Sequence, residues 1–393
     1  MKINYNKSEV FTIGISEVDS ERIADAFNCK LGHFPMKYLG LPISYKRLSK
    51  EELSSSAGKV EKRLEVWKCN QLSHGGRSIL INSSLTSIPM YTMGFYWLHE
   101  GTQKRLDTTR GRFFWEGVGN KKKYHMIKWE TLAVPKEFGG IGFVDTRAMN
   151  KALLAKWIYK LDRGDNTLAL EVLRKKYLGN NSFCQSKQKC TSQFWQGLEK
   201  AKEWYERGIK WKLGNGRKIR FWHDVWLGEC SLKIRYPRLF RICRQQDWSV
   251  ADLREVEWDL DLRRRLGIEE VAEWNELQEA LDLVEFSEEV DDVVIWALEP
   301  SGNFSAKSLY RFMKTSGEVD IRMTNLWKMK LPLKIKIFLW MLWHDRVQTG
   351  EQLKIRKGKG SERCKYCGKL ETRSHLFFNL TSLKLSGCGL ELV

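Results

Sequence analysis

A chain of 393 residues is long enough for two or three domains, each with its own hydrophobic core. Hydrophobic residues make up 42% of it and there are 17 tryptophans, which indicates folded rather than disordered material. The longest apolar run, Ile337 to Trp343, is far shorter than the roughly 18–20 residues of a membrane span. The first residues, "MKINYNKSEV", lack an apolar signal core, and apart from one close pair the nine cysteines are irregularly spaced. We therefore expect an intracellular protein with reduced thiols, nuclear or cytoplasmic and not secreted.

The formal net charge of +19 is distributed unevenly along the chain. Counting Lys and Arg against Asp and Glu gives +21 for residues 1–250, −13 for 251–300 (4 basic, 17 acidic) and +10 for 321–375 (14 basic, 4 acidic). A basic chain interrupted by an acidic segment is typical of a protein that binds nucleic acid through its phosphates. A basic surface that is only solvated gives the same totals, so that alternative stays open.

Short strands followed by helices are expected in the N-terminal half. Alternating apolar residues at 3, 5, 11 and 13 predict a β-hairpin or strand pair. Ser49 and Glu52 form a capping box, and the apolar spacing after them predicts an amphipathic helix reaching Trp67. Further helices are expected over 77–88, ended by Pro89, from about 145, and over 166–178 and 192–207.

The segment "IKWKLGNGRKIRFW" carries the strongest hairpin signal. Asn215-Gly216 favours a tight turn between two strands. One face of the expected hairpin is apolar, and the other is basic, with Lys210, Lys212, Lys218 and Arg220.

Helices are expected again towards the C-terminus. The acidic stretch 251–290 has apolar residues at helical spacing, Ser305 and Pro332 each precede a helix, and Thr349 caps a short basic one. The predicted fold class is mainly α with short β-hairpins (α+β).

Several long motifs resemble one family, in that family's order. They are "KINYNKSEV", "KYLGLPIS", "LSHGGRSILINSSLTSIPMYTM", "WETLAVPKEFGGIGF", "MNKALLAKWIYKL" and "GNGRKIRFWHDVWLG". "SGNFSAKSLYRFM" and "LWKMKLPLKIKIFLW" follow, and then a Cys/His cluster. From about residue 1 to residue 379 the chain resembles the C-terminal part of a plant-type LINE (non-LTR) retrotransposon reverse transcriptase, including its zinc-binding domain.

The resemblance implies a division of the chain into four segments. These are the end of a polymerase palm-like region (1–45), a helical thumb-like region (46–180), a Trp-rich hairpin with an acidic helical connector (181–300), and a truncated reverse transcriptase zinc-binding domain (301–393).

Catalytic residues are not expected in this chain. The family's palm carries an aromatic-x-Asp-Asp turn, which the resemblance places upstream of the segment that begins at Met1. Asp291–Asp292 is the chain's Asp-Asp pair, but position 289 is Glu and the surroundings are acidic. Two-metal phosphoryl transfer needs carboxylates that converge from separate strands. We therefore expect no polymerase activity from the chain as it stands.

A zinc site is expected near the C-terminus. Cys364, Cys367 and His375 match the family's Cys-x2-Cys…His-x4-Cys pattern, but Leu380 stands where the fourth ligand falls. Structural zinc takes four protein ligands, and catalytic zinc takes three plus water. Either Cys388 supplies the fourth ligand, or water does, or the domain is metal-free and frayed.

Basic residues are the candidates for contact with RNA or DNA. A thumb holds its duplex by the backbone, which needs cations more than sequence-reading side chains. The candidates are Lys121, Lys122, Lys123, the hairpin residues Lys210, Lys212, Lys218 and Arg220, and, before the cysteines, Lys334, Lys336, Arg346, Arg356 and Lys357.

Three functions stay open at this point. The first is a non-catalytic part of a reverse transcriptase that binds RNA or DNA through thumb-like and zinc-domain surfaces. The second is an RNA-directed DNA polymerase, active once joined to an upstream palm. The third is a protein-interaction scaffold built on the acidic segment 251–300 and the many tryptophans.

Overall fold

The computed structural model describes residues 4–5, 8–66, 72–116, 124–186, 191–315, 317–357 and 361–377. The chain forms two compact units, each assembled from separate stretches of sequence. Unit 1 comprises residues 1–56, 90–99 and 147–313, and unit 2 comprises residues 57–89, 100–146 and 314–393. The four-segment division inferred from the sequence stays a prediction.

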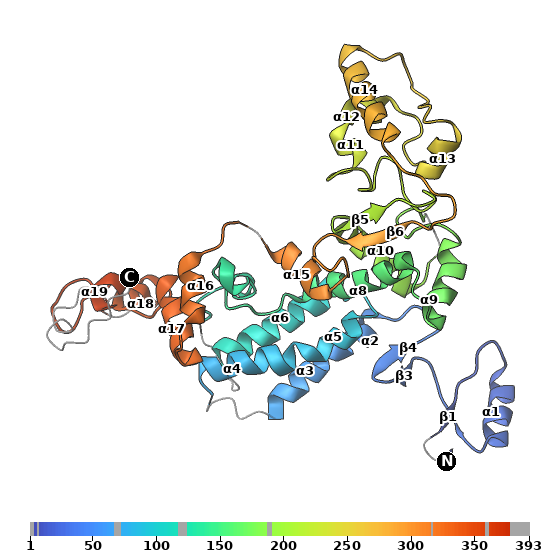
Figure 1. Cartoon of the computed structure of the whole chain (residues 1–393). Coiled ribbons are helices and arrows are strands. Elements are labelled where there is room, and N and C mark those ends of the chain that lie inside the picture. Colours follow the sequence, from blue (N-terminus) through green and yellow to red (C-terminus); the bar gives the residue numbers. More distant parts are fainter. Residues whose placement is uncertain are drawn as a thin grey trace. The chain divides into compact units, whose positions relative to one another are not determined.

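Unit 1 combines helices with three two-stranded sheets in the part of it that the structure describes (Figure 1). Its N-terminal elements are β1 (Glu9–Val10), α1 (Glu17–Ala26), β2 (Lys30–Leu31), β3 (Met36–Tyr38), β4 (Leu41–Ile43) and α2 (Lys50–Leu53). Its later elements are α8 (Thr146–Arg163), α9 (Leu168–Leu173), the π-helical η5 (Arg174–Leu178), α10 (Gln193–Glu206), β5 (Ile209–Lys212), α11 (Leu232–Arg235), α12 (Pro237–Ile242), α13 (Val250–Glu255), α14 (Ile268–Asp282), β6 (Val293–Trp296) and α15 (Ala306–Lys314).

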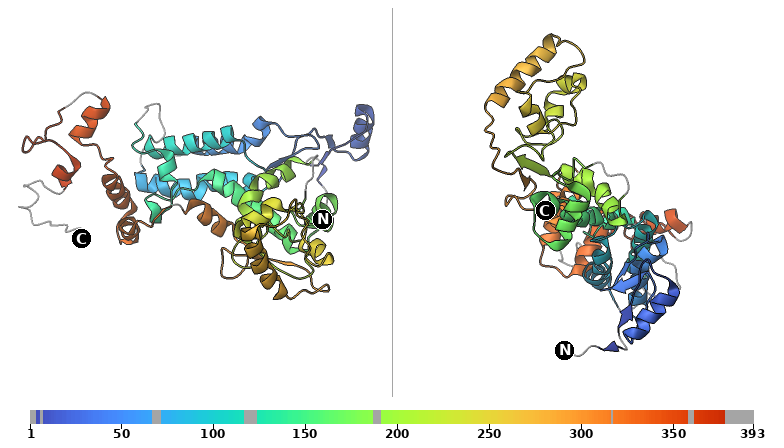
Figure 2. Two further views of the ribbon diagram at one scale, coloured as in Figure 1. Left: turned by 90° about the horizontal axis from the view of Figure 1, so that it is seen from above. Right: turned by 90° about the vertical axis from the view of Figure 1, so that its right-hand side faces the viewer.

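Unit 2 is built from helices in its described residues. They are α3 (Ser55–Val66), α4 (His74–Leu80), the π-helical η3 (Ile81–Leu85), α6 (Glu100–Trp115), α7 (Trp129–Leu132), the 3-10 helix η4 (Lys136–Phe138), α16 (Ile321–Lys328), α17 (Leu333–Trp343), α18 (Gly350–Lys357) and α19 (Arg373–Phe377). Helix α5 (Ser87–Met93) begins in unit 2 and ends in unit 1. Helix α4 packs against both α6 and α17, and Figure 2 gives two further views of these helices. The predicted mainly helical α+β class is confirmed.

No helix in the described ranges combines the length and the apolar character that crossing a membrane requires.

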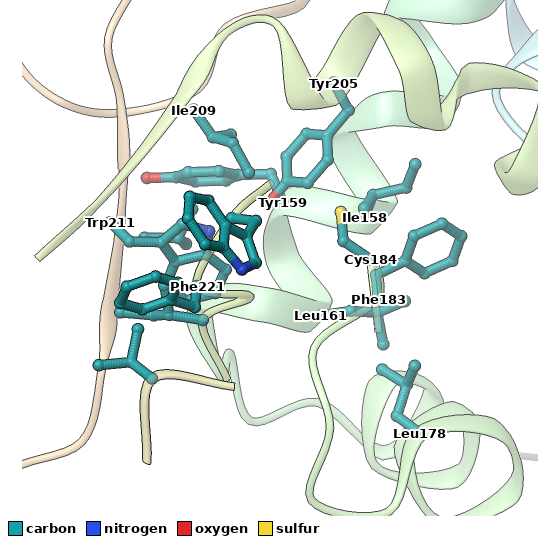
Figure 3. Packing of buried hydrophobic residues seen from close by; sticks show 14 of the residues in the cluster. Ile158, Tyr159, Leu161, Leu178, Phe183, Cys184, Tyr205, Ile209, Trp211 and Phe221 are labelled. Atoms are coloured by element: carbon teal, nitrogen blue, oxygen red, sulfur yellow. The ribbon is translucent and has the colours of Figure 1, made fainter. Parts of the chain in front are cut away.

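The core of unit 1 is aromatic (Figure 3). Trp296 of β6 is fully buried, stacks with Tyr205 of α10 at 6.3 Å between ring centroids, and donates its indole N–H to Ser308 Oγ at 2.7 Å. Gly208 lets this indole approach, because a Cβ there would lie 2.4 Å from the Trp296 ring. The high tryptophan content that indicated a folded chain thus reflects, in part, tryptophans buried in this core.

The N-terminal strand prediction was wrong in its pairing, as far as it concerns the described residues; Ile3 lies outside them. β1 pairs with β2 in parallel, not as a hairpin, because α1, which Ser16 caps, lies between the two strands in the sequence. A hairpin does form later, where β3 and β4 pair antiparallel across Leu39 and Gly40. Both of these turn residues have positive φ, 48° and 86°, as a tight hairpin turn requires.

The predicted helix end at Pro89 was also wrong. Pro89 is the third residue of α5, so it lies in the first helical turn, where backbone N–H groups have no partner within the helix. The capping box of Ser49 and Glu52 is confirmed, although Ser54 separates the short α2 from α3.

The predicted hairpin around Asn215-Gly216 does not form. β5 pairs antiparallel with β6, with Ile209 opposite Trp296. Instead of a second strand, the loop 214–218 wraps around the carboxylate of Asp292, which accepts from the N–H groups of Gly214 (2.9 Å), Gly216 (2.8 Å) and Lys218 (2.9 Å). The acidic pair that invited a catalytic reading therefore positions a loop through its buried member.

Replacing Asp292 should destabilise unit 1 strongly. Asp292→Ala leaves three backbone N–H groups without their acceptor, and each buried unsatisfied group costs about 1–3 kcal/mol. We expect a loss of roughly 3 kcal/mol or more in the free energy of unfolding, measured by urea denaturation. The matched control is Asp291→Ala, because the Asp291 side chain is 77% exposed and should contribute under about 1 kcal/mol. Equal losses in the two variants would contradict this role for Asp292.

A second buried carboxylate makes stability depend on pH. Burial raises the pKa of Asp162 to about 6. Hydrogen bonds from the Phe183 N–H (2.7 Å) and the Tyr205 O–H (2.8 Å) lower it, but burial has the larger effect. Between pH 4 and 6 the unfolded chain loses this proton while the folded chain keeps it. The contribution of Asp162 to stability therefore falls as pH rises through that window and is constant above it.

Asp162→Asn should remove this dependence. The amide can accept from Phe183 and donate to Tyr205 without ionising. The stability of the variant relative to the parent chain should rise by about 3 kcal/mol from pH 4 to pH 7, which urea denaturation at several pH values measures. A difference that does not change with pH would rule out the raised pKa.

Candidate metal centre

The two cysteines of the predicted zinc site are held in a tight turn. Arg363 and Leu370 form an antiparallel bridge, and inside it the Cys364 N–H donates to Lys369 O at 2.7 Å. The Gly368 N–H donates to Cys364 O at 2.9 Å. Gly368 has φ of 73°, a conformation that glycine adopts without strain, so the turn needs a glycine here.

The histidine comes from the short helix α19. Thr372 precedes this helix, and its Oγ1 accepts from the His375 N–H at 3.1 Å. This cap fixes the first turn of α19 and directs His375 back towards the cysteine turn.

The three predicted ligands converge. Cys364 Sγ, Cys367 Sγ and the His375 ring nitrogen all lie within 4.8 Å of one another, and Cys367 Sγ is 2.9 Å from His375 Nε2. Tetrahedral zinc with Zn–S near 2.3 Å separates its ligand atoms by roughly 3.8 Å, so one ion can be bound by all three. Cys364 is buried, Cys367 is exposed and His375 is half-buried. Two sulfurs and an imidazole suit zinc, and the residues present fit it.

Two neighbours that the sequence did not single out as site residues tie the cluster to the rest of unit 2. Glu371 accepts from the Gly350 N–H at 2.7 Å and so caps α18. Arg373 donates to the carbonyls of Leu342 and Trp343, at 3.0 and 2.9 Å, at the end of α17. Local sequence patterns do not point to these contacts, because Glu371 bonds a backbone N–H 21 residues away and Arg373 bonds backbone carbonyls about 30 residues away.

The identity of the fourth ligand is not decided by the described residues. Leu380 and Cys388 lie outside the described residues, and within the described part Cys364, Cys367 and His375 form the one group of this kind.

Comparison with known proteins agrees with this geometry. Residues 304–383 match the family described as zinc-binding in reverse transcriptase, a range that includes all three ligands and Leu380. An "uncharacterized mitochondrial protein" of Arabidopsis thaliana is 30% identical over 143 residues, which cover 36% of this chain and 93% of the relative. The chain belongs to the retrotransposon reverse transcriptase-related family.

A second relative covers more of the chain. It is described as a "Putative ribonuclease H protein" of Arabidopsis thaliana and is 27% identical over 353 residues, 86% of this chain. The match spans 55% of the relative's own length, a little over half.

The basic candidates in unit 2 have different environments. Lys334, at the start of α17, is exposed, as is Arg346 just after that helix. The Lys336 Nζ instead donates to Trp327 O at 2.8 Å. Arg356 and Lys357 lie in α18, and Lys121, Lys122 and Lys123 lie outside the described residues.

The basic candidates in unit 1 are largely paired with acids. Lys210 pairs with Glu229, and Lys218 Nζ lies 3.8 Å from Asp291. Arg220 binds Asp224 at 2.6 Å and Glu206 at 2.8 Å. Lys212 is exposed.

Arg220 is the most strongly neutralised of these. Burial alone would lower the pKa of its guanidinium, but the Asp224 and Glu206 carboxylates raise it above its ordinary value. With the expected hairpin absent, the four residues do not form one basic strand face, and Arg220 has little capacity left for a phosphate.

Zinc content tests the cluster directly. We expect the purified chain to bind about one zinc ion and Cys364→Ser to lose most of it, because two ligands cannot form the site. Cys230→Ser is the matched control, since Cys230 lies outside the group and is half-buried. Mass spectrometric metal analysis of the three proteins gives the answer, and equal zinc in all three would contradict the assignment. The same analysis of Cys388→Ser tests whether Cys388 supplies the fourth ligand.

Proposed function

We propose that this chain is a non-catalytic, nucleic-acid-binding part of a LINE-type (non-LTR) reverse transcriptase. It would bind the backbone of RNA or DNA through the basic surface around its zinc-binding domain. The observation that carries the proposal is the positive charge of residues 321–375, +10 in all, in the segment that contains the three metal ligands.

Two of the four acids of this segment are engaged by groups other than Lys334 and Arg346. Glu362 pairs with Lys354 at 2.8 Å, and Glu371 is used by the Gly350 N–H. Lys334 and Arg346 are exposed, so their charges face solvent. Phosphate contacts from such side chains give affinity without base specificity.

A cavity beside Arg346 adds an aromatic side chain to this surface. It has a volume of about 320 Å³, and its lining includes Tyr124, Lys128, His344 and Arg346. Tyr124 is 59% exposed. A tyrosine flanked by cations can stack on an unpaired base while the cations contact phosphate, which favours a site for single-stranded nucleic acid.

The absence of catalysis is supported by what the acidic pair does. Asp292 is 4% exposed and accepts three backbone hydrogen bonds, while Asp291 is exposed. Neither arrangement offers the converging carboxylates that two catalytic metal ions need. Polymerase activity would therefore require a palm from outside this chain, and we expect no primer extension from the chain alone.

Nucleic-acid binding should depend steeply on salt. Anisotropy of a labelled single-stranded oligonucleotide should show affinity falling between about 50 and 200 mM salt, because binding releases counterions. Arg346→Ala should weaken binding and reduce the slope of log K against log[salt] by roughly one. Lys104→Ala on α6 is the matched control, an exposed lysine outside the surface proposed here.

Absence of binding at low salt would overturn the proposal. The protein-interaction scaffold built on residues 251–300 would then be the better account.

A further inference from the structure

A second basic groove lies in unit 2, formed by residues that the sequence did not single out. It has a volume of about 510 Å³ and runs between α3 and the segment formed by η3 and the start of α5. Its lining consists of Lys59, Lys62, Arg63, Ser83, Ser84, Ser87 and Ile88.

Helix α3 supplies the cations. Lys59, Lys62 and Arg63 are spaced three and four residues apart, so they share one face of the helix. Ala57 and Val60 are 1% and 0% exposed and fix the helix against the core of unit 2. The three basic side chains are exposed, on the side of α3 that does not face this core.

A π-helical turn supplies two of the three hydroxyl groups, those of Ser83 and Ser84, and the start of α5 supplies that of Ser87. Over Ile81–Leu85 the helix widens, and both the N–H and the Oγ1 of Thr86 bond to Ile81 O, at 2.9 and 2.7 Å. Ile81 and Leu85 are fully buried, which holds the turn in place. The serines of the turn then face the groove. π-helical turns of this kind occur frequently at functional sites.

The groove has the chemistry of a phosphate site. Its described lining holds three cations and three hydroxyls and no carboxylate. Of the two acids of α3, Glu61 is engaged by Arg105 through two hydrogen bonds, at 2.7 and 2.5 Å. Lys, Arg and Ser are among the residues that proteins use to contact phosphate oxygens.

We propose that this groove binds the phosphodiester backbone of a nucleic-acid strand. The inference rests on the proposed nucleic-acid-binding function and assigns it a second surface, separate from the residues around the zinc ligands. The groove is shallow and its cations follow the length of a helix, which suits a polymer rather than a single nucleotide, because small ligands occupy cavities that enclose most of their surface.

Neutral substitutions on α3 test the proposal. The double variant Lys62→Gln and Arg63→Gln keeps good helix formers and removes two charges, so affinity should fall and the salt slope should decrease by roughly two. The matched control is Lys104→Gln with Lys156→Gln, two exposed helical lysines that do not line the groove. A slope in the α3 variant equal to that of the parent chain overturns the proposal, provided that circular dichroism shows the same helicity.

Serine substitutions distinguish binding in this specific groove from binding to a general positive charge. Ser83→Ala with Ser84→Ala should weaken binding roughly fivefold and leave the salt slope unchanged, because hydroxyl groups release no counterions. Unchanged affinity would overturn the assignment of the π-helical turn to the site.

Competition distinguishes the polymer from a single phosphate. Inorganic phosphate or adenosine monophosphate at matched ionic strength should fail to displace the oligonucleotide, and displacement would overturn the backbone assignment. Failure of this inference is distinguishable from failure of the proposed function. In the first case the parent chain binds and the α3 variant binds equally well, and in the second the parent chain does not bind.

Discussion

The carboxylate of Asp292 is the constraint on which the centre of unit 1 depends. By accepting three backbone N–H groups of loop 214–218, it prevents that loop from forming a second strand and joins it to the start of β6. β6 then pairs with β5 and brings Trp296 against Tyr205 in the aromatic core. A buried charge is tolerated in such a place only when its hydrogen bonds are satisfied, and here backbone groups satisfy them.

Unit 2 has a comparable fixed point in the turn that holds Cys364 and Cys367. Hydrogen bonds from Gly350 to Glu371 and from Arg373 to the end of α17 attach this turn to its neighbouring helices. The ligand atoms are thus brought close by the surrounding backbone, and bound zinc would add to an arrangement that the chain already favours. Because metal binding and folding are coupled in small zinc domains, loss of a ligand is expected to affect the helices attached to the turn as well as the metal.

Charge is used differently in the two units. In unit 1, carboxylates take up much of the predicted basic face: Lys210, Lys218 and Arg220 each have an acidic partner. In unit 2, Lys62, Arg63, Lys334 and Arg346 are exposed, and the described linings of its two basic cavities contain no carboxylate. A formal count of charges along the sequence does not distinguish these cases. The electrostatic field near a surface depends on which charges are already paired.

The sequence by itself determined what local spacing and residue chemistry control. The helical class, the Ser49 cap and the set of three metal ligands follow from periodicity, capping and motif spacing, and the structure agrees with them. Only the tertiary structure decided the partner of β5, the continuation of α5 through Pro89 and the pairing of Arg220. The first depends on a contact between segments far apart in the chain, and the second on an N–H that needs no partner in a first turn. The third depends on how residues 206–224 fold, since Arg220 reaches both Glu206 and Asp224 only because 219–221 is not part of a hairpin. The groove of Lys62, Arg63 and the η3 serines was missed because its two walls come from different helices.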